Sequence, residues 1–247
     1  MKTLVSVTEE SVRAAAEQIL AVIKRKPDAV IALGALCGEE TVLRELSRRA
    51  EAEAVSLDTV RFFAVCAFDG LSPDDPAGVG ARLAEALMRP SGAGKSDLLL
   101  PEADDPAEYD EKLRAAGGID LALLGLGDNA RVGFNEPATP YDSHTHLQKL
   151  TDRTKKELAP FFGGEEKVPP RGVTMGFREL CAAREIVVIA HGEQKSKALY
   201  HMLYARDDSV YPAAFLQLPA NVTVYADTGA AKLLGEKHFD AVVFNGD

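Results

Sequence analysis

Blocks of apolar residues alternate with amphipathic segments along almost the whole chain. Short apolar runs typical of buried strands cover residues 28–34, 59–68, 119–127, 185–192, 221–227 and 240–245. Apolar positions at helical spacing cover residues 8–25, 38–54, 80–89, 106–118 and 193–205. Alternating strands and helices, with strands that are apolar throughout, indicate a parallel sheet covered on both faces. We therefore predict a doubly wound, mostly parallel α/β fold of the Rossmann-like type.

The chain has no feature that would divide it. It contains 247 residues, 46% of them hydrophobic, which is enough for one large α/β core. We find no internal repeat, low-complexity segment or linker, and predict a single domain over residues 1–247. Residues 151–172 are polar and interrupted by Pro160, Pro169 and Pro170. This composition leaves open whether the segment forms a mobile lid.

Charge and cysteine content exclude several kinds of partner. The net charge is −10 and no run is strongly basic, so we expect neither nucleic acid nor an anionic membrane as a partner. No apolar run reaches the roughly 20 residues of a membrane helix. Cys37, Cys66 and Cys181 are far apart and form neither a disulfide framework nor a CxxC metal site. A reducing cytoplasm is the expected location.

The loops after the strands are where such a sheet binds ligands. The most informative of them is GLGDNARVGFNEP, residues 125–137. Its glycines suit a tight turn between a strand and a helix, which is a purely structural interpretation. Beyond the turn, Phe134 can anchor the loop, Glu136 supplies a carboxylate, and Pro137 fixes the exit of the chain.

This run resembles the signature of the glucosamine-6-phosphate deaminase/isomerase family, which is related to 6-phosphogluconolactonases and typically reads G-x-G-x-D-G-H-[IV]-A-F-N-E-P. DSHTHLQKLT, VTMGFREL, IAHGEQKSKAL and FLQLPANVTVYAD are similar to later blocks of the family, so the resemblance covers most of the chain. The FNEP ending favours the deaminase branch. The resemblance implies opening of an amino-sugar phosphate ring, proton transfer between C2 and C1, and release of ammonia, without a metal or an organic cofactor.

The family's catalytic positions carry different residues in this chain. The resemblance places the C2 base on Cys66, the signature Asp on Asn129 and the signature His on Arg131, while Glu136 is retained. Asn129 cannot take up a proton, and Arg131 stays charged at every working pH. We predict that Arg131 fills the space of the missing histidine and either pairs with Glu136 or clamps an anionic ligand.

Two other groups are candidates for the missing base. Asp69 lies three residues beyond Cys66, and a small loop shift would bring it into the site, although an aspartate that caps the loop is the structural alternative. Cys66 is itself a candidate base or nucleophile, but its apolar neighbours also suit a buried packing thiol.

Sugar phosphate, or a related anion, is the ligand that the resemblance implies. Gly34, Gly38 and Gly127 are the expected backbone contacts, and Lys195 matches the family's phosphate-binding lysine. Lys195 should therefore face the 125–137 loop, although a solvated helix lysine is the alternative. The neighbouring Glu39 and Glu40 would repel a phosphate, yet acidic residues also stabilise a helix N-terminus.

His144 and His146 form an H-x-H pair that could place both rings on one face of an extended segment. Asp142 could join them only if the chain turned, and a zinc site needs three or four converging ligands. We therefore predict no metal site.

Two functions remain open on this basis. The first is an amino-sugar-phosphate deaminase or aldose–ketose isomerase with a rearranged site, in which standard glucosamine-6-phosphate deamination is doubtful. The second is a catalytically silent relative that binds a sugar phosphate or another anionic metabolite. A homo-oligomer is compatible with both.

Overall fold

Eight parallel strands form the central sheet of the computed structural model, which describes residues 1–89, 98–206, 210–235 and 241–242. Their order is β11 (Ala241–Val242), β1 (Lys2–Ser6), β10 (Val222–Asp227), β9 (Glu185–Ala190), β6 (Leu121–Gly125), β2 (Val30–Leu33), β3 (Arg61–Ala64) and β5 (Leu98–Leu99). From β2 the chain proceeds outward to β3 and β5, then returns to the other side of β2 and continues outward through β6, β9 and β10. The strand order therefore reverses between β2 and β6, which is where such sheets bind ligands.

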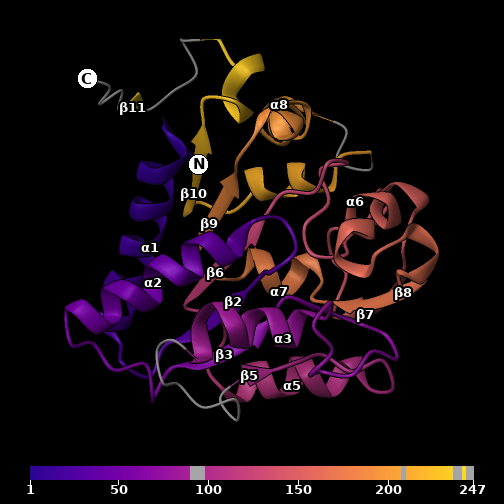
Figure 1. Ribbon diagram of the computed structural model, residues 1–247, viewed down its shortest axis with the longest axis horizontal. Coiled ribbons are helices and arrows are strands. Elements are labelled where there is room, and N and C mark those ends of the chain that lie inside the picture. Colours follow the sequence, from indigo (N-terminus) through magenta and orange to yellow (C-terminus); the bar gives the residue numbers. More distant parts are fainter. Residues whose placement is uncertain (90–97, 207–209, 236–240, 243–247) are drawn as a thin grey trace.

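Helices cover both faces of this sheet, as predicted (Figure 1). One face packs against α1 (Thr8–Arg25), α2 (Glu39–Ala52), α3 (Val79–Leu83) and the π-helical turn η1 (Ala84–Met88). The opposite face packs against α5 (Pro106–Ala115), α7 (Phe177–Cys181), α8 (Ser196–Tyr204), η5 (Pro212–Gln217) and η6 (Ala230–Leu233).

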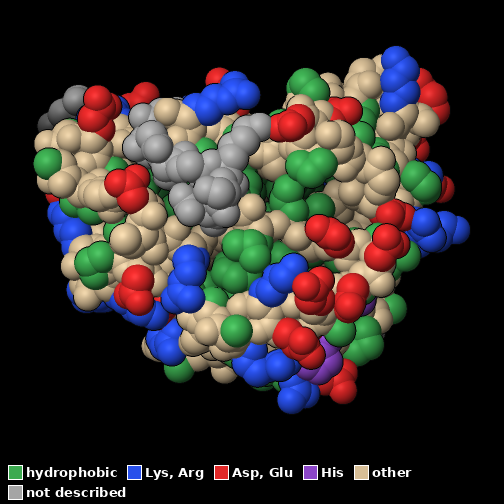
Figure 2. All heavy atoms as spheres, turned by 90° about the horizontal axis from the view of Figure 1, so that it is seen from below, with side chains coloured by type: hydrophobic (Ala, Val, Ile, Leu, Met, Phe, Trp, Pro, Cys, Tyr) green, Lys and Arg blue, Asp and Glu red, His purple; other side chains and the backbone are tan. Residues whose placement is uncertain are grey.

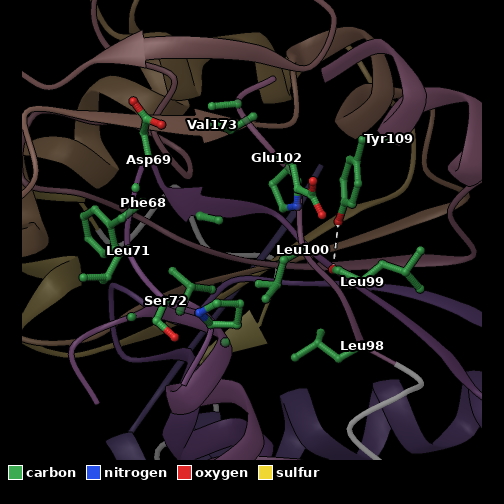
Figure 3. Close-up of a pocket in the computed structure, with 18 of the residues that line it drawn as sticks. Phe68, Asp69, Leu71, Ser72, Leu98, Leu99, Leu100, Glu102, Tyr109 and Val173 are labelled. Carbon is green, nitrogen blue, oxygen red and sulfur yellow. Dashed lines mark hydrogen bonds between the residues drawn. The ribbon is translucent and has the colours of Figure 1, made fainter. Parts of the chain in front are cut away.

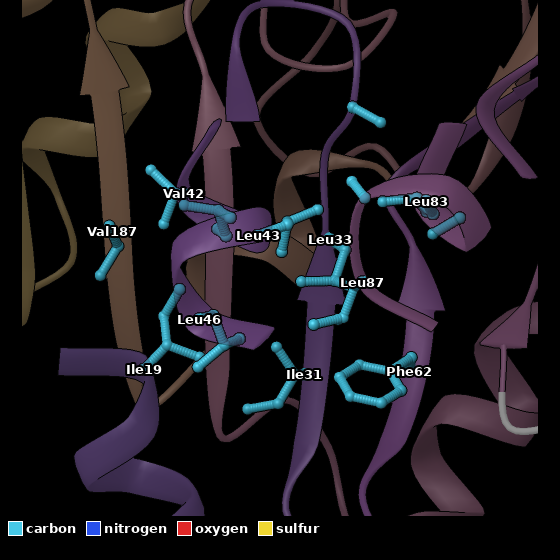
Figure 4. Close-up of a cluster of buried hydrophobic side chains, with 14 of the residues drawn as sticks. Ile19, Ile31, Leu33, Val42, Leu43, Leu46, Phe62, Leu83, Leu87 and Val187 are labelled. Atoms are coloured by element: carbon cyan, nitrogen blue, oxygen red, sulfur yellow. The ribbon is translucent and has the colours of Figure 1, made fainter. Parts of the chain in front are cut away.

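The alternation of side chains along a strand divides the core into two halves. Ile31 and Leu33 of β2 lie in the cluster beneath α1 and α2, together with Leu43 and Leu46 of α2 (Figure 4). Val30 and Ala32 of the same strand face the other half of the core. Because β2 is buried on both sides, every one of its residues has to be apolar, which explains the continuous apolar run in the sequence.

A second, smaller sheet was not predicted. It consists of β4 (Cys66–Phe68), β8 (Arg171–Thr174) and β7 (His146–Lys149), all antiparallel. We predicted one strand over residues 59–68, and this prediction was wrong, because the segment divides between the two sheets at Val65. The Val65 amide still donates to Leu33 of the main sheet, whereas its carbonyl accepts from Met175 after β8. An unbroken apolar run does not reveal such a transfer.

The remaining elements follow the predicted pattern with small changes. Helix α6 (Asp152–Phe162) was not predicted, because residues 151–172 were expected to be a polar segment interrupted by prolines. Pro160 lies inside this helix, which ends two residues later, and its lack of an N–H group removes one helical hydrogen bond. The 310 turn η3 (Glu165–Lys167) follows α6, and η4 (Glu193–Lys195) precedes α8. Of the predicted strand over residues 240–245, only Ala241–Val242 belongs to the described residues.

Charged groups of both signs are distributed over the surface. On the face shown in Figure 2, Lys and Arg side chains are interspersed with Asp and Glu. Among the described residues, none of the helices is long and apolar enough to cross a membrane.

Phe134 joins the small sheet to the central one. Its ring is fully buried, lies 5.0 Å from the ring of Phe68 in β4, and packs so closely on Gly172 of β8 that a Cβ there would overlap it. The Phe134 amide donates to Thr174 Oγ1 at 3.2 Å. One aromatic side chain thus fixes the 125–137 loop against both neighbouring strands of the small sheet.

We expect Phe134→Ala to lower the free energy of unfolding by roughly 3–5 kcal/mol, because it leaves a cavity at a site that three elements share. Urea denaturation followed by circular dichroism measures the change. Leu218→Ala, at a position that is 63% exposed, is the control and should change stability by less than about 0.5 kcal/mol. Similar losses in the two variants would contradict this anchoring role.

Candidate functional site

The loops after β2, β6 and β9 meet at the carboxyl ends of these adjacent strands. Lys195, in the turn after β9, contacts Asp128 in the 125–137 loop, with 2.6 Å between Nζ and Oδ1. Glu39, which begins α2 after β2, lies against Gly125 at the end of β6. Helix α6 closes the group from the side of the small sheet by contributing Glu157. The site is therefore built from four segments that are far apart in the sequence.

Glu157 is the central acceptor of this site. One carboxylate oxygen accepts from Lys195 Nζ at 2.7 Å, and the other accepts from Arg131 Nη2 at 3.1 Å and from the Asp128 amide at 3.3 Å. Its side chain is only 13% exposed. Burial alone would raise the pKa of Glu157, but Arg131 and Lys195 reverse this effect and lower the pKa overall. Glu157 is therefore an ionised carboxylate held by two cations and one N–H group.

Arg131 is completely buried in this network. Besides Glu157, its guanidinium donates to the Gly133 carbonyl at 2.5 Å, whereas its Nε lacks a partner within the described structure. A Cβ on Gly127 would overlap the Arg131 side chain, so a glycine is needed at that position. The predicted pair between Arg131 and Glu136 does not form, because Glu157 takes its place.

Lys195 faces the 125–137 loop and does not extend into solvent. Its side chain is 8% exposed and contacts both Asp128 and Glu157. Burial lowers the pKa of Lys195, but the nearby Cys37 and Glu157 outweigh burial and raise it overall. The ammonium group thus stays charged, and carboxylates of this same chain already bind it.

The loop after β2 carries a second internal carboxylate. Glu39 is buried, and its Oε2 accepts from the Cys37 amide at 2.6 Å. A Cβ on either Gly34 or Gly125 would overlap the Glu39 carboxyl group, so these two glycines make room for it. Burial and the neighbouring Glu40 raise the pKa of Glu39. Gly38 has φ of 99° at the start of α2, a conformation that favours glycine.

Glu136, the carboxylate that the signature retains, is held by neutral partners. Glu136 is fully buried and accepts from Asn129 Nδ2 at 2.7 Å and from the Thr151 amide at 3.2 Å. Asn129 Oδ1 accepts in turn from the Arg131 amide at 3.2 Å. An amide, a hydroxyl and a peptide N–H orient Glu136, but none of these groups can exchange a proton with it near neutral pH.

Cys66 and Asp69, the two candidate bases, have separate surroundings. Cys66 is buried at the start of β4, next to Gly133, and burial strongly raises the pKa of its thiol. Asp69 forms an ion pair with Arg171 at 2.7 Å. It also lines a cavity of about 920 Å³ on the other side of β4, together with Leu100 and Glu102 (Figure 3). Neither Arg131 nor Lys195 contributes to that cavity.

Sequence reasoning missed two of the groups that define the site. Asp128 was part of the quoted loop, but its role depends on Lys195, 67 residues away. Glu157 lies 26 residues beyond Arg131 and has no local signal, because it is one of several charged residues in α6. A carboxylate that reaches both Arg131 and Lys195 can be identified only from the fold, because these residues are far apart in the sequence.

Comparisons with known proteins agree with this architecture. The family profile described as glucosamine-6-phosphate isomerases/6-phosphogluconolactonase matches residues 5–225. Glucosamine-6-phosphate deaminase of Bacillus velezensis is 34% identical over 229 residues, covering 90% of this chain and 95% of the relative. The enzyme of the same name from Rhodopirellula baltica is 35% identical over 221 residues, covering 87% and 88%.

Solved structures give the same assignment. A monomeric glucosamine-6-phosphate deaminase superimposes with a TM-score of 0.90 at 31% identity, covering 94% of this chain and all of that one. The 6-phosphogluconolactonase of Leishmania guyanensis, at 21% identity, shares the fold with a TM-score of 0.73 over 95% of this chain and all of its own. The chain therefore belongs to the glucosamine-6-phosphate isomerase/6-phosphogluconolactonase family, on its deaminase-like side.

Proposed function

We propose that this chain is a non-deaminating member of its family, a binding relative whose anion site is occupied by its own Glu157 carboxylate. The contacts of Glu157 with Lys195, Arg131 and the Asp128 amide carry this proposal. Two cations and a backbone N–H group around one carboxylate form the arrangement that would otherwise bind a phosphate or carboxylate ligand. A sugar phosphate or a related anion would bind here only by replacing Glu157.

The chemistry of deamination lacks its proton carriers in this arrangement. The resemblance assigns the C2 base to the position of Cys66, whose thiol stays protonated because burial raises its pKa. Asn129 does not titrate, and Arg131 stays charged because the acidic groups around it raise its pKa although burial opposes them. General acid–base groups contribute about 10²–10⁴-fold each, so the combined replacement removes most of the rate.

The charge balance also opposes an added phosphate. Glu157 and Asp128 already offset Lys195 and Arg131, and Glu39 adds another buried acidic group nearby. A ligand anion within about 4 Å of one of these carboxylates would be repelled by about 4 kcal/mol at an effective dielectric constant of 20. Displacement of Glu157 would remove one of these repulsions and free Arg131, while Lys195 would still contact Asp128.

We expect no production of fructose-6-phosphate and ammonia when the purified chain is given glucosamine-6-phosphate, because the base, Asp and His positions are replaced together. A coupled assay measures the rate, and the Bacillus velezensis relative run in parallel is the control. A turnover of about 1 per second or faster, which is common for enzymes, would refute the proposal.

Glu157→Gln should raise the affinity for glucosamine-6-phosphate and for inorganic phosphate by about tenfold or more. The amide keeps the shape of the side chain but removes the negative charge that competes for Lys195 and Arg131. Isothermal titration calorimetry measures both affinities in the wild type and the variant.

Glu166→Gln is the matched control for this titration, because Glu166 is an exposed glutamate nine residues further along and its substitution changes the net charge equally. Its affinities should equal those of the wild type. If Glu157→Gln remains folded by circular dichroism and binds neither anion more tightly, Glu157 does not occupy an anion site.

One observation favours a second candidate, an aldose–ketose isomerase with a relocated base. Glu39 is buried between Gly34 and Gly125 at the ends of two adjacent strands, and burial, followed by the neighbouring Glu40, raises its pKa, the direction that a carboxylate acting as a general base requires. Any isomerase activity found on a panel of aldose phosphates should then fall at least about 100-fold in Glu39→Gln. Activity that survives this substitution would eliminate Glu39 as the base.

A further inference from the structure

Three separate segments bring metal-binding side chains together away from the site described above. Asp110 comes from α5, His144 from the loop before β7, and Glu179 from α7. His144 Nδ1 lies 2.7 Å from Glu179 Oε1 and 3.4 Å from Asp110 Oδ2. One ligand atom of each residue lies within 4.8 Å of the other two, close enough for a single ion to contact all three.

The carboxylates of this cluster are buried but incompletely satisfied. The side chains of Asp110 and Glu179 are 7% and 10% exposed. Glu179 Oε2 is buried and has no hydrogen-bond partner within the described part of the chain. Such an oxygen is costly unless a donor or a cation reaches it.

The surroundings hold Asp110 and His144 in place. The amide and the hydroxyl of Thr145 both donate to the Asp110 carboxylate. His146 Nδ1 hydrogen-bonds to the backbone carbonyl of His144 at 2.7 Å, and its side chain does not join the cluster. Hydrogen bonds such as those from Thr145 to Asp110 orient the ligands in known metal sites.

We infer that Asp110, His144 and Glu179 bind a divalent first-row transition-metal ion. Two carboxylates and one imidazole suit Zn²⁺, Mn²⁺, Fe²⁺ or Co²⁺, whereas Ca²⁺ and Mg²⁺ prefer oxygen ligands alone. His144 is 56% exposed, so the ion can enter from solvent and complete its coordination with water. The sequence predicted no metal site, and this cluster differs from the H-x-H pair weighed there: His144 takes part, but His146 and the exposed Asp142 do not.

The bound ion would join α5, the loop before β7 and α7. An ion that binds only the folded chain stabilises it in proportion to the logarithm of its concentration. Binding of the ion would displace the hydrogen bond between His144 and Glu179. The inference is independent of the proposed function, because no residue is shared between the two sites.

Co²⁺ titration of the chelator-treated full chain tests the site. We expect one ion per chain, visible d–d absorption without a thiolate charge-transfer band, and a higher thermal midpoint. Cys37 and Cys181 are partly exposed thiols, and a charge-transfer band would show that a cysteine binds the ion and would overturn the assignment.

His144→Ala and Glu179→Gln should each weaken Co²⁺ binding at least tenfold and abolish the thermal shift, whereas His146→Ala should leave both unchanged. His144 is mostly exposed, so its variant should fold even if Glu179→Gln does not. Absence of binding by the wild type, or equal binding by His144→Ala and His146→Ala, would overturn the inference and leave His144 as an ion-pair partner of two carboxylates.

Discussion

The buried ion pair between Glu157 and Arg131 is the constraint on which the site depends. A guanidinium without solvent exposure needs a partner, because an unpaired buried charge costs several kcal/mol. Glu157 is the acidic partner that α6 supplies, and Lys195 adds a second positive charge to it. The ion pair therefore ties α6 to the signature loop and closes the site on that side. Gly127 is part of the same requirement, since any side chain there would collide with Arg131.

The sequence predicted the frame of this site because the frame has local causes. Apolar runs specify strands such as β2 and β9, and Gly125 and Gly127 at the end of β6 leave the space that Glu39 and Arg131 occupy. The pairing of Arg131 with Glu157 was harder to predict, because the two residues are 26 positions apart and strand β7 of the small sheet lies between them in the sequence. The strand pairing of β4 with β8 was missed for the same reason, since each is three or four residues long and has no pattern of its own. Short-range patterns thus determine where a ligand site lies, and long-range pairing determines what occupies it.

Internal carboxylates change what the family frame can bind. In this chain Glu157 accepts from two cations, and Glu39 accepts from a loop amide, so donors that suit an anion already have internal carboxylates as partners, although Arg131 Nε has none within the described structure. Satisfied donors no longer favour a ligand, and a ligand has to compensate for every contact that it displaces. The site should then select ligands whose carboxylate or phosphate forms hydrogen bonds at least as good as those of the Glu157 carboxylate that it replaces. The affinity for such a ligand would depend on how much more strongly the ligand anion binds Arg131 and Lys195 than Glu157 does.

Under the proposed function, family membership and activity separate for a physical reason. The fold is maintained by the two halves of the core and by anchors such as Phe134, none of which requires a titrating group. The positions that the resemblance assigns to proton transfer carry a buried thiol, an amide and a permanently charged guanidinium, which is why we propose a non-deaminating role. The buried charge of Arg131 needs a neutralising carboxylate, and Glu157 supplies it. In that proposal, an arginine at the position where the resemblance expects a histidine both lacks an exchangeable proton and favours closing the site from within.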